Sequence, residues 1–243
     1  MRATLFALCA CLMSATLVSA AREKPDRPAP RTRDYDWMSV ATWRQRHDAN
    51  VARAAQGDCD ILLLGDSITE GWNQTTLWEE RYPHLKIANF GIGGDTTANL
   101  LWRLENGEIG ALKPQVIVMM IGTNNLGRNE DRPAAVVNGI QAIVSVLHAR
   151  LPGAKIVLLG VLPVGQEPKT RIRKQVDEMN TQLVKTLHDG HSVFVANLAD
   201  AVLETDGSIS ASTMADFLHP TPAGYQRLAE ALFPQLERMV GRL

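Results

Sequence analysis

Short apolar runs recur along the chain and predict buried strands. Four of them are nearly unbroken, and they lie at residues 61–64, 116–121, 156–160 and 193–196. Residues 86–91 form a fifth, more mixed candidate. A strand that is buried on both faces of a parallel sheet carries a continuous apolar run, whereas a strand with one wet face alternates apolar and polar positions. We therefore expect a sheet of five parallel strands.

Between these runs, apolar residues recur three or four positions apart, as they do on one face of a helix. The segments with this spacing are residues 36–56, 100–104, 133–150 and 169–188, with a shorter helix candidate at 75–80. A last helix is expected to start near residues 221–222, where threonine offers an N-cap and proline follows it. Strands that alternate with helices form right-handed βαβ units. The sequence thus predicts an α/β fold of three layers: a doubly wound, flavodoxin-like, five-stranded parallel sheet with helices on both faces.

The first 34 residues differ from the rest of the chain. Residues 1–20 combine Arg2, an apolar stretch and small residues up to Ala20, a pattern that is typical of a secretory signal peptide. We expect cleavage near Ala20 and export to the periplasm or the medium, and a buried N-terminal helix is the alternative. Residues 21–34 are rich in proline and charge, and we expect them to form an extended, poorly ordered leader. Residues 35–243 are long enough to form one domain with its own core.

Composition and charge indicate which kinds of binding partner and cofactor to expect. The 243 residues include 25 basic and 26 acidic side chains, so the formal net charge of −1 favours neither nucleic acid nor an anionic membrane as a partner. After the signal peptide, Cys59 is the one cysteine, which excludes an internal disulfide and fits a small buried side chain. Because no cysteine and histidine cluster has metal-ligand spacing, we expect neither a metal nor a cofactor, and we expect no membrane span in the mature chain.

Polar residues follow the first three predicted strands at the point where each strand ends. Ser67 follows the first strand, Gly94 the second and Asn124 the third, and Asp216 and His219 come shortly before the last helix. Each of these stretches alone has the composition of an ordinary turn. In an open α/β sheet, however, ligands bind in the crevice beyond the carboxyl ends of the strands. We therefore expect these side chains to converge on one site.

These residue types supply the parts of a hydrolytic site. A serine hydroxyl is a weak nucleophile, so Ser67 needs a base such as His219, and Asp216 would orient the imidazole and stabilise its protonated form. The backbone N–H groups of Ser67 and Gly94 and the side-chain amide of Asn124 would form an oxyanion hole.

Two apolar side chains flank the predicted nucleophile and base. Ile68 follows Ser67, and Leu218 precedes His219. They would either wall an acyl pocket or pack in the core.

The chain resembles the SGNH (GDSL) hydrolase family. The resemblance covers about residues 36–241, and it rests on four blocks: Gly65-Asp66-Ser67, Gly91-Ile92-Gly93-Gly94-Asp95, Gly122-Thr123-Asn124-Asn125 and Asp216-x-x-His219. Within the family the chain is most similar to the catalytic subunits of platelet-activating factor acetylhydrolase type Ib, on residues 89–97 and 216–219. The resemblance implies a triad of Ser67, Asp216 and His219, the oxyanion hole given above, and no metal.

The expected function is that of a serine esterase. It would hydrolyse short-chain esters of small molecules, acetyl esters foremost, through an acyl-enzyme, and export favours acetylated carbohydrates as substrates. A lysophospholipase or thioesterase is the nearest alternative, and it would need a long apolar groove. A flavodoxin-like binding protein with an inactive site is the second alternative. The similar acetylhydrolase subunits dimerise, so the resemblance also implies a homodimer.

Overall fold

A computed structural model describes residues 23–241 and contains the expected sheet of five parallel strands. The strands are β1 (Ile61–Gly65), β2 (Ile87–Gly91), β3 (Val116–Met120), β4 (Lys155–Leu159) and β5 (Val193–Ala196). Their order in the sheet is β2-β1-β3-β4-β5, which is the doubly wound, flavodoxin-like order. The predicted α/β fold is confirmed. The expected signal peptide at residues 1–20 lies outside the described residues.

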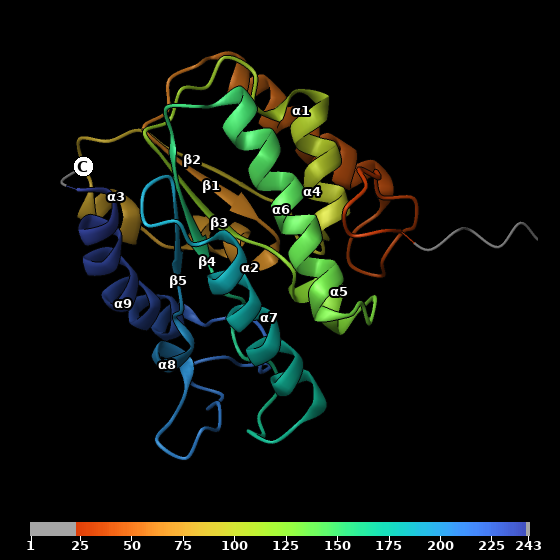
Figure 1. Cartoon of the computed structure of the whole chain (residues 1–243), viewed down its shortest axis with the longest axis vertical. Coiled ribbons are helices and arrows are strands. Elements are labelled where there is room, and N and C mark those ends of the chain that lie inside the picture. Colours follow the sequence, from red (N-terminus) through yellow and green to blue (C-terminus); the bar gives the residue numbers. More distant parts are fainter. Residues whose placement is uncertain (1–22, 242–243) are drawn as a thin grey trace, which may run out of the picture.

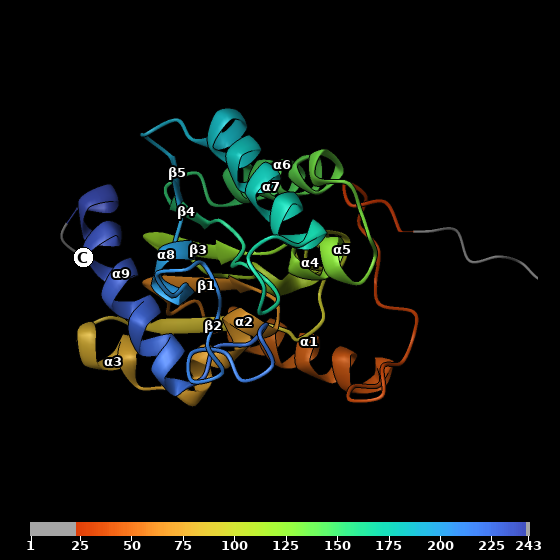
Figure 2. The ribbon, with the colours of Figure 1, turned by 90° about the horizontal axis from the view of Figure 1, so that it is seen from below.

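Helices cover both faces of this sheet (Figures 1 and 2). One face carries α4 (Thr97–Arg103), α6 (Pro133–Arg150) and α7 (Arg171–Leu187), which pack against one another in that order. The opposite face carries α3 (Leu77–Arg81) and α9 (Pro222–Val240), which are drawn below the sheet in Figure 2. No helix of the described part of the chain is both long and apolar enough to cross a membrane.

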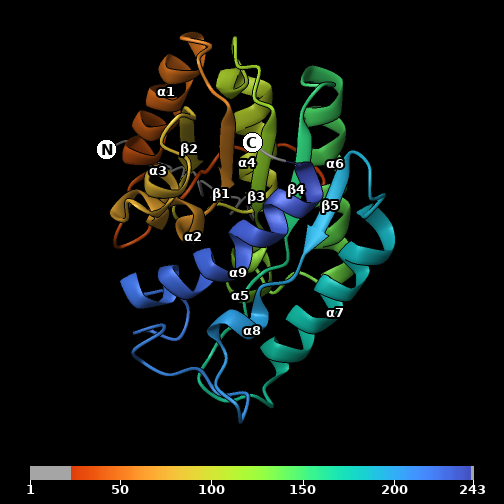
Figure 3. The ribbon, with the colours of Figure 1, turned by 90° about the vertical axis from the view of Figure 1, so that its left-hand side faces the viewer.

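The remaining helical segments lie beside this frame or at one end of it. Near the N-terminus, α1 (Val40–Ala55) packs against η2 (Leu104–Glu108), the irregular turn that continues α4. Three short helices each follow a strand: α2 (Ser67–Glu70), α5 (Thr123–Gly127) and α8 (Ala199–Val202). The 3-10 turn η1 (Gly71–Gln74) continues α2. Figure 3 shows α2, α5 and α8 gathered at the carboxyl ends of the strands. The sequence periodicity did not predict α2 and α5, because four or five residues are too few to display a helical repeat.

Burial explains the two kinds of strand pattern. All five residues of β1 and of β3 are buried, which matches their continuous apolar runs. The edge strand β2 alternates buried and half-buried positions instead, so its sequence is more mixed. Each fully buried leucine or isoleucine contributes about 1.5–3 kcal/mol to the hydrophobic stabilisation of the fold. Cys59 is also buried, as expected.

The proline-rich leader is not poorly ordered, and that expectation is wrong for its described part. Residues 23–38, here called the N-terminal strap, run along the start of α4 (Figure 1, red). The Thr97 hydroxyl donates to the Pro25 carbonyl at 2.8 Å, and the Asn99 amide donates to the Ala29 carbonyl at 3.0 Å. Proline has no N–H but keeps its carbonyl, so a proline-rich segment can be held by donors on the domain. Arg31 of the strap is only 3% exposed.

Candidate active site

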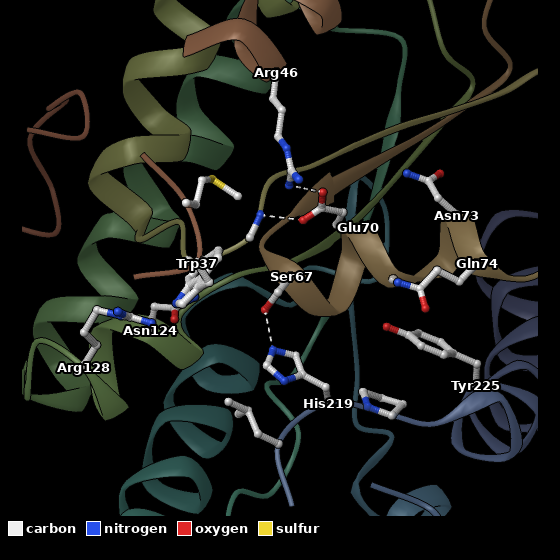
Figure 4. A pocket seen from close by; sticks show the side chains of 16 residues that line it. Trp37, Arg46, Ser67, Glu70, Asn73, Gln74, Asn124, Arg128, His219 and Tyr225 are labelled. Carbon is white, nitrogen blue, oxygen red and sulfur yellow. Dashed lines mark hydrogen bonds and ion pairs between the residues drawn. The ribbon is translucent and has the colours of Figure 1, made fainter. Parts of the chain in front are cut away.

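Four of the predicted catalytic and oxyanion-hole residues line one cavity at the carboxyl edge of the sheet. Ser67 begins α2 directly after β1, and Gly94 lies in the loop between β2 and α4. Asn124 lies in α5 after β3, and His219 lies in the loop before α9. The cavity that they share has a volume of about 580 Å³. Figure 4 shows the Ser67 hydroxyl facing the His219 ring at its centre.

A continuous hydrogen-bonded chain joins Ser67, His219 and Asp216. The Ser67 Oγ lies 2.9 Å from Nε2 of His219, and Nδ1 of that ring lies 2.6 Å from Oδ2 of Asp216. Because a carboxylate accepts at Nδ1, that nitrogen carries the proton, and Nε2 is free to accept a proton from the hydroxyl. The geometry is that of a nucleophile, a base and a group that orients the base.

The Asp216 carboxylate is fixed by its own loop. Its Oδ1 accepts the backbone N–H groups of His219 at 2.7 Å and of Leu218 at 3.1 Å. Burial favours the neutral acid, but these hydrogen bonds and the His219 side chain outweigh it and hold the pKa of Asp216 below its ordinary value. Asp216 is therefore an anion at neutral pH and can stabilise a protonated imidazole.

The turn that presents Ser67 depends on close backbone packing at Gly65. A Cβ on Gly65 would lie 2.1 Å from the Thr69 hydroxyl and 2.2 Å from the Met120 carbonyl, so no larger residue fits. Asp66 then caps α2, since its Oδ1 accepts the Ile68 N–H at 3.0 Å. Together these two residues end β1 abruptly and place Ser67 at the floor of the cavity.

Asp66 has a second contact that sequence reasoning missed. Its Oδ2 accepts from the Asn124 side-chain amide at 3.3 Å, and the same amide donates to the Asp95 carbonyl at 3.0 Å. These contacts orient the Asn124 amide. Full burial, with the nearby Asp95 adding to it, raises the pKa of Asp66 to about 7. The one signal for this residue in the sequence was its position beside Ser67.

The predicted oxyanion-hole donors meet at the cavity. Gly94 has a φ of +77°, and a Cβ there would lie 2.8 Å from the Trp37 ring, so both backbone and space require glycine. The backbone N–H groups of Ser67 and Gly94 make no hydrogen bond to another of residues 23–241. Both backbone donors are therefore available to a ligand, whereas the two N–H groups of the Asn124 amide are engaged by Asp66 and Asp95.

The two candidate acyl-pocket residues lie in different surroundings in the structure. Leu218 lines the cavity. Ile68 is 1% exposed and packs in the core, because the second residue of α2 points inward. Of the two readings left open for these residues, the pocket fits Leu218 and core packing fits Ile68.

The outer walls of the cavity come from segments that sequence reasoning did not assign to the site. Trp37 of the strap is 54% exposed and stands at the mouth, where its ring stacks on Tyr35. Figure 4 shows Trp37 and Arg128 on one side of Ser67, with Asn73, Gln74 and Tyr225 on the other. An exposed tryptophan in a charged segment has no sequence pattern that marks it as a wall of a site. Within residues 23–241, no group of three or more His, Cys, Asp or Glu residues is arranged to hold a metal ion.

Comparisons with known proteins agree with this geometry. A model of the GDSL-like lipase/acylhydrolase family matches residues 63–227. Human platelet-activating factor acetylhydrolase IB subunit alpha2 is 38% identical over 190 residues, covering 78% of this chain and 81% of that protein. The human subunit alpha1 is 36% identical over 221 residues, covering 89% of this chain and 93% of that protein.

Solved structures support the fold. A GDSL-like lipase from Bacteroides thetaiotaomicron superposes with a TM-score of 0.64 at 21% identity, covering 82% of this chain and 98% of that one. The acetylxylan esterase Axe2 from Geobacillus stearothermophilus gives a TM-score of 0.60 at 23% identity, covering 78% of this chain and 97% of that one. At these identities the structural likeness concerns the fold alone. With the family match and the sequence relatives, the chain belongs to the GDSL-like lipase/acylhydrolase family and is a carboxylic ester hydrolase.

Proposed function

We propose that the protein is a serine esterase that removes short acyl groups, acetyl foremost, through an acyl-enzyme. The observation that carries this proposal is the hydrogen-bonded chain from Ser67 through His219 to Asp216, which opens on the cavity. A flavodoxin-like binding protein with an inactive site has no need of that chain, so this alternative is disfavoured.

Acylation begins at Ser67. Its Oγ attacks the ester carbonyl carbon while Nε2 of His219 takes the hydroxyl proton, and the negative charge moves to the former carbonyl oxygen. The N–H groups of Ser67 and Gly94 stabilise that oxyanion. The Asn124 amide joins them by exchanging its 3.3 Å contact with Asp66 for the oxyanion. The intermediate then collapses, the carbon–oxygen bond to the alcohol breaks, and His219 gives its proton to the departing alkoxide.

Deacylation repeats these steps with water as the nucleophile. His219 removes a proton from water as the water oxygen attacks the acyl carbon. The second intermediate expels the Ser67 oxygen, which recovers its proton from His219, and the carboxylic acid leaves. Asp216 stabilises the imidazolium in both halves of the reaction.

Acetylated carbohydrates are the proposed substrate class. An exposed indole such as Trp37 offers an apolar face to a sugar ring, and Asn73 and Gln74 on the opposite wall offer amide donors and acceptors. Two similar proteins, a platelet-activating factor acetylhydrolase and an acetylxylan esterase, act by their names on acetyl esters. A lysophospholipase or thioesterase would need a long apolar groove, whereas Arg46, Glu70 and Arg128 line this cavity.

Export and dimer formation belong to the proposal as well. Residues 1–20 have the pattern of a signal peptide, and an exported esterase would meet acetylated carbohydrates outside the cytoplasm. N-terminal sequencing of the protein from the periplasm or medium tests export and cleavage near Ala20. Light scattering tests whether the protein is a dimer.

The proposal is tested by hydrolysis of 4-nitrophenyl esters from acetate to octanoate, with EDTA present, by wild type and Ser67→Ala. Release of acetic acid from acetylated xylose and xylo-oligosaccharides follows. We expect Ser67-dependent hydrolysis that is fastest with acetate, and release of acetate from the sugars. A preference for octanoate would favour the lysophospholipase or thioesterase. Equal, weak activity in wild type and Ser67→Ala would overturn the assignment of the nucleophile.

A further inference from the structure

Charged side chains from two distant segments hold both peptide groups of Gly93. The Gly93 N–H donates to Oε2 of Glu70 at 2.8 Å, and the Gly93 carbonyl accepts from Nη2 of Arg31 at 2.7 Å. Glu70 belongs to α2 and is held in turn by an ion pair with Arg46 (Figure 4). Arg31 belongs to the N-terminal strap, which precedes the part of the chain that matches the family model.

The carbonyl that Arg31 binds and the oxyanion donor are two ends of one peptide unit. The Gly93 carbonyl and the Gly94 N–H share a planar trans peptide bond, so they point in opposite directions. A hydrogen bond that fixes the carbonyl therefore fixes the direction of the N–H. Gly93 and Gly94 have no side chains with which to hold themselves, and glycine is the most flexible residue.

Arg31 is rigidly placed for this contact. Its side chain is 2% exposed and lies 3.2 Å from Oδ1 of Asp95, which is itself fully buried. The guanidinium also lies 4.7 Å from the centre of the Tyr35 ring. Asp95 is fixed by Trp43, whose indole N–H donates to it at 2.7 Å, and by Arg103 at 2.7 Å. A buried and multiply bonded arginine of this kind holds its position without further ordering cost.

The charge of Arg31 also strengthens the donor. A hydrogen bond from a cation to a carbonyl polarises the whole peptide group, which makes its N–H more positive. An oxyanion is stabilised most by donors that are aimed and polarised before the charge develops. Arg31 thus acts on the oxyanion through the Gly93–Gly94 peptide, without touching the substrate.

We infer that Arg31 and Glu70 are positioning residues that aim the Gly94 N–H at the oxyanion. The inference rests on the proposed function. It assigns the N-terminal strap a part in the reaction, although the strap contributes no residue to the triad.

The test compares Arg31→Met, Arg31→Lys and Glu70→Ala with wild type on 4-nitrophenyl acetate. The matched control is Arg33→Met, which removes an exposed arginine from the same strap. Folded content is followed by circular dichroism and thermal unfolding. We expect kcat to fall about 10- to 100-fold in Arg31→Met and in Glu70→Ala, with KM within about threefold of wild type. Arg31→Lys, which keeps the charge but not the planar fork, should recover part of the loss.

A second measurement separates positioning from a merely structural role. A methyl trifluoromethyl ketone adds reversibly to Ser67 and carries an oxyanion in the adduct. Its inhibition constant should rise by the same factor by which kcat/KM falls, while inhibition by acetate stays unchanged.

Two results would overturn the inference but leave the proposed function standing: wild-type kcat in folded Arg31→Met and Glu70→Ala, or an unchanged inhibition constant for the ketone. If Arg31→Met does not fold, Glu70→Ala decides. If wild type shows no Ser67-dependent hydrolysis, the proposed function fails and the inference fails with it.

Discussion

Asp216 has two separable roles: its oxygen orients the His219 ring, and its negative charge stabilises the protonated ring. Asp216→Asn keeps an oxygen that can accept from Nδ1 of His219 but loses the negative charge that stabilises the imidazolium. We expect kcat on 4-nitrophenyl acetate to fall by roughly 10³- to 10⁴-fold, with little change in KM. Asp206→Asn is the matched control, because Asp206 is an exposed aspartate whose Oδ1 also accepts a backbone N–H, at 2.9 Å from Ser208. An Asp216→Asn enzyme within tenfold of wild type would contradict this role.

The two candidate acyl-pocket residues give a second prediction at the residue scale. Leu218→Ala removes a side chain from the cavity wall, so the ratio of butyrate to acetate hydrolysis should rise severalfold. Ile68→Ala removes a side chain from the core, so it should lower the free energy of unfolding by about 2–5 kcal/mol and leave that ratio unchanged. Urea unfolding and the ester series measure the two effects. A change of acyl preference in Ile68→Ala but not in Leu218→Ala would reverse the assignment.

The site residues that could be predicted from the sequence are those that lie in a recognisable local sequence pattern. Ser67 follows an apolar run, and Asp216 and His219 share one short turn. Arg31, Glu70 and Trp37 have no such local mark. Their contacts with Gly93 and Gly94 join segments far apart in the chain, so only the fold brings them to the site.

At the scale of elements, the packing of α2 on β2 fixes where Ser67 stands. A Cβ on Gly91 would lie 2.2 Å from the backbone nitrogen of Glu70, and backbone cannot move aside as a side chain can. Gly91→Ala should therefore lower the free energy of unfolding by about 3 kcal/mol or more. Gly153→Ala is the control, because nothing lies within 4 Å of its Cβ, and its effect should stay within about 0.5 kcal/mol. Equal urea midpoints for the two variants would contradict the close approach of α2 to β2.

Elements with a long pattern were predictable, whereas those defined by partners were not. The run at residues 116–121 and the periodicity at 133–150 correspond to β3 (Val116–Met120) and α6 (Pro133–Arg150). The strap has the composition of a disordered leader, yet Thr97 and Asn99 at the start of α4 bind its carbonyls. Composition reports how little apolar surface a segment can bury, but it does not report the donors that another element offers it.

At the scale of the whole molecule, two buried carboxyl groups link stability to pH. Burial raises the pKa of Asp66 to about 7 and that of Asp95 to about 6. The folded state therefore binds protons more tightly than the unfolded chain, whose aspartates ionise near pH 4. The stabilisation is fully present below pH 4 and is lost as the pH rises through 6 and 7.

We accordingly expect the free energy of unfolding to be higher at pH 5 than at pH 8. Urea unfolding at one-unit intervals measures it, and Asp66→Asn should flatten the slope because that side chain cannot ionise. Asp216 does not disturb this window, since its lowered pKa affects stability only at more acidic pH. A wild-type stability that rises from pH 5 to pH 8 would contradict the burial of these charges.

Covalent trapping of the acyl group tests whether Ser67 is the nucleophile. Wild type is mixed with 4-nitrophenyl acetate, quenched in acid within the first turnovers and digested, and the peptides are weighed by mass spectrometry beside those of Ser67→Ala. The mechanism predicts one acetyl group on the peptide that contains Ser67, which disappears once the substrate is consumed, and none on the variant. Turnover of the ester with no acetyl group on Ser67, or the same acetylated peptide in wild type and Ser67→Ala, would contradict an acyl-enzyme at this serine.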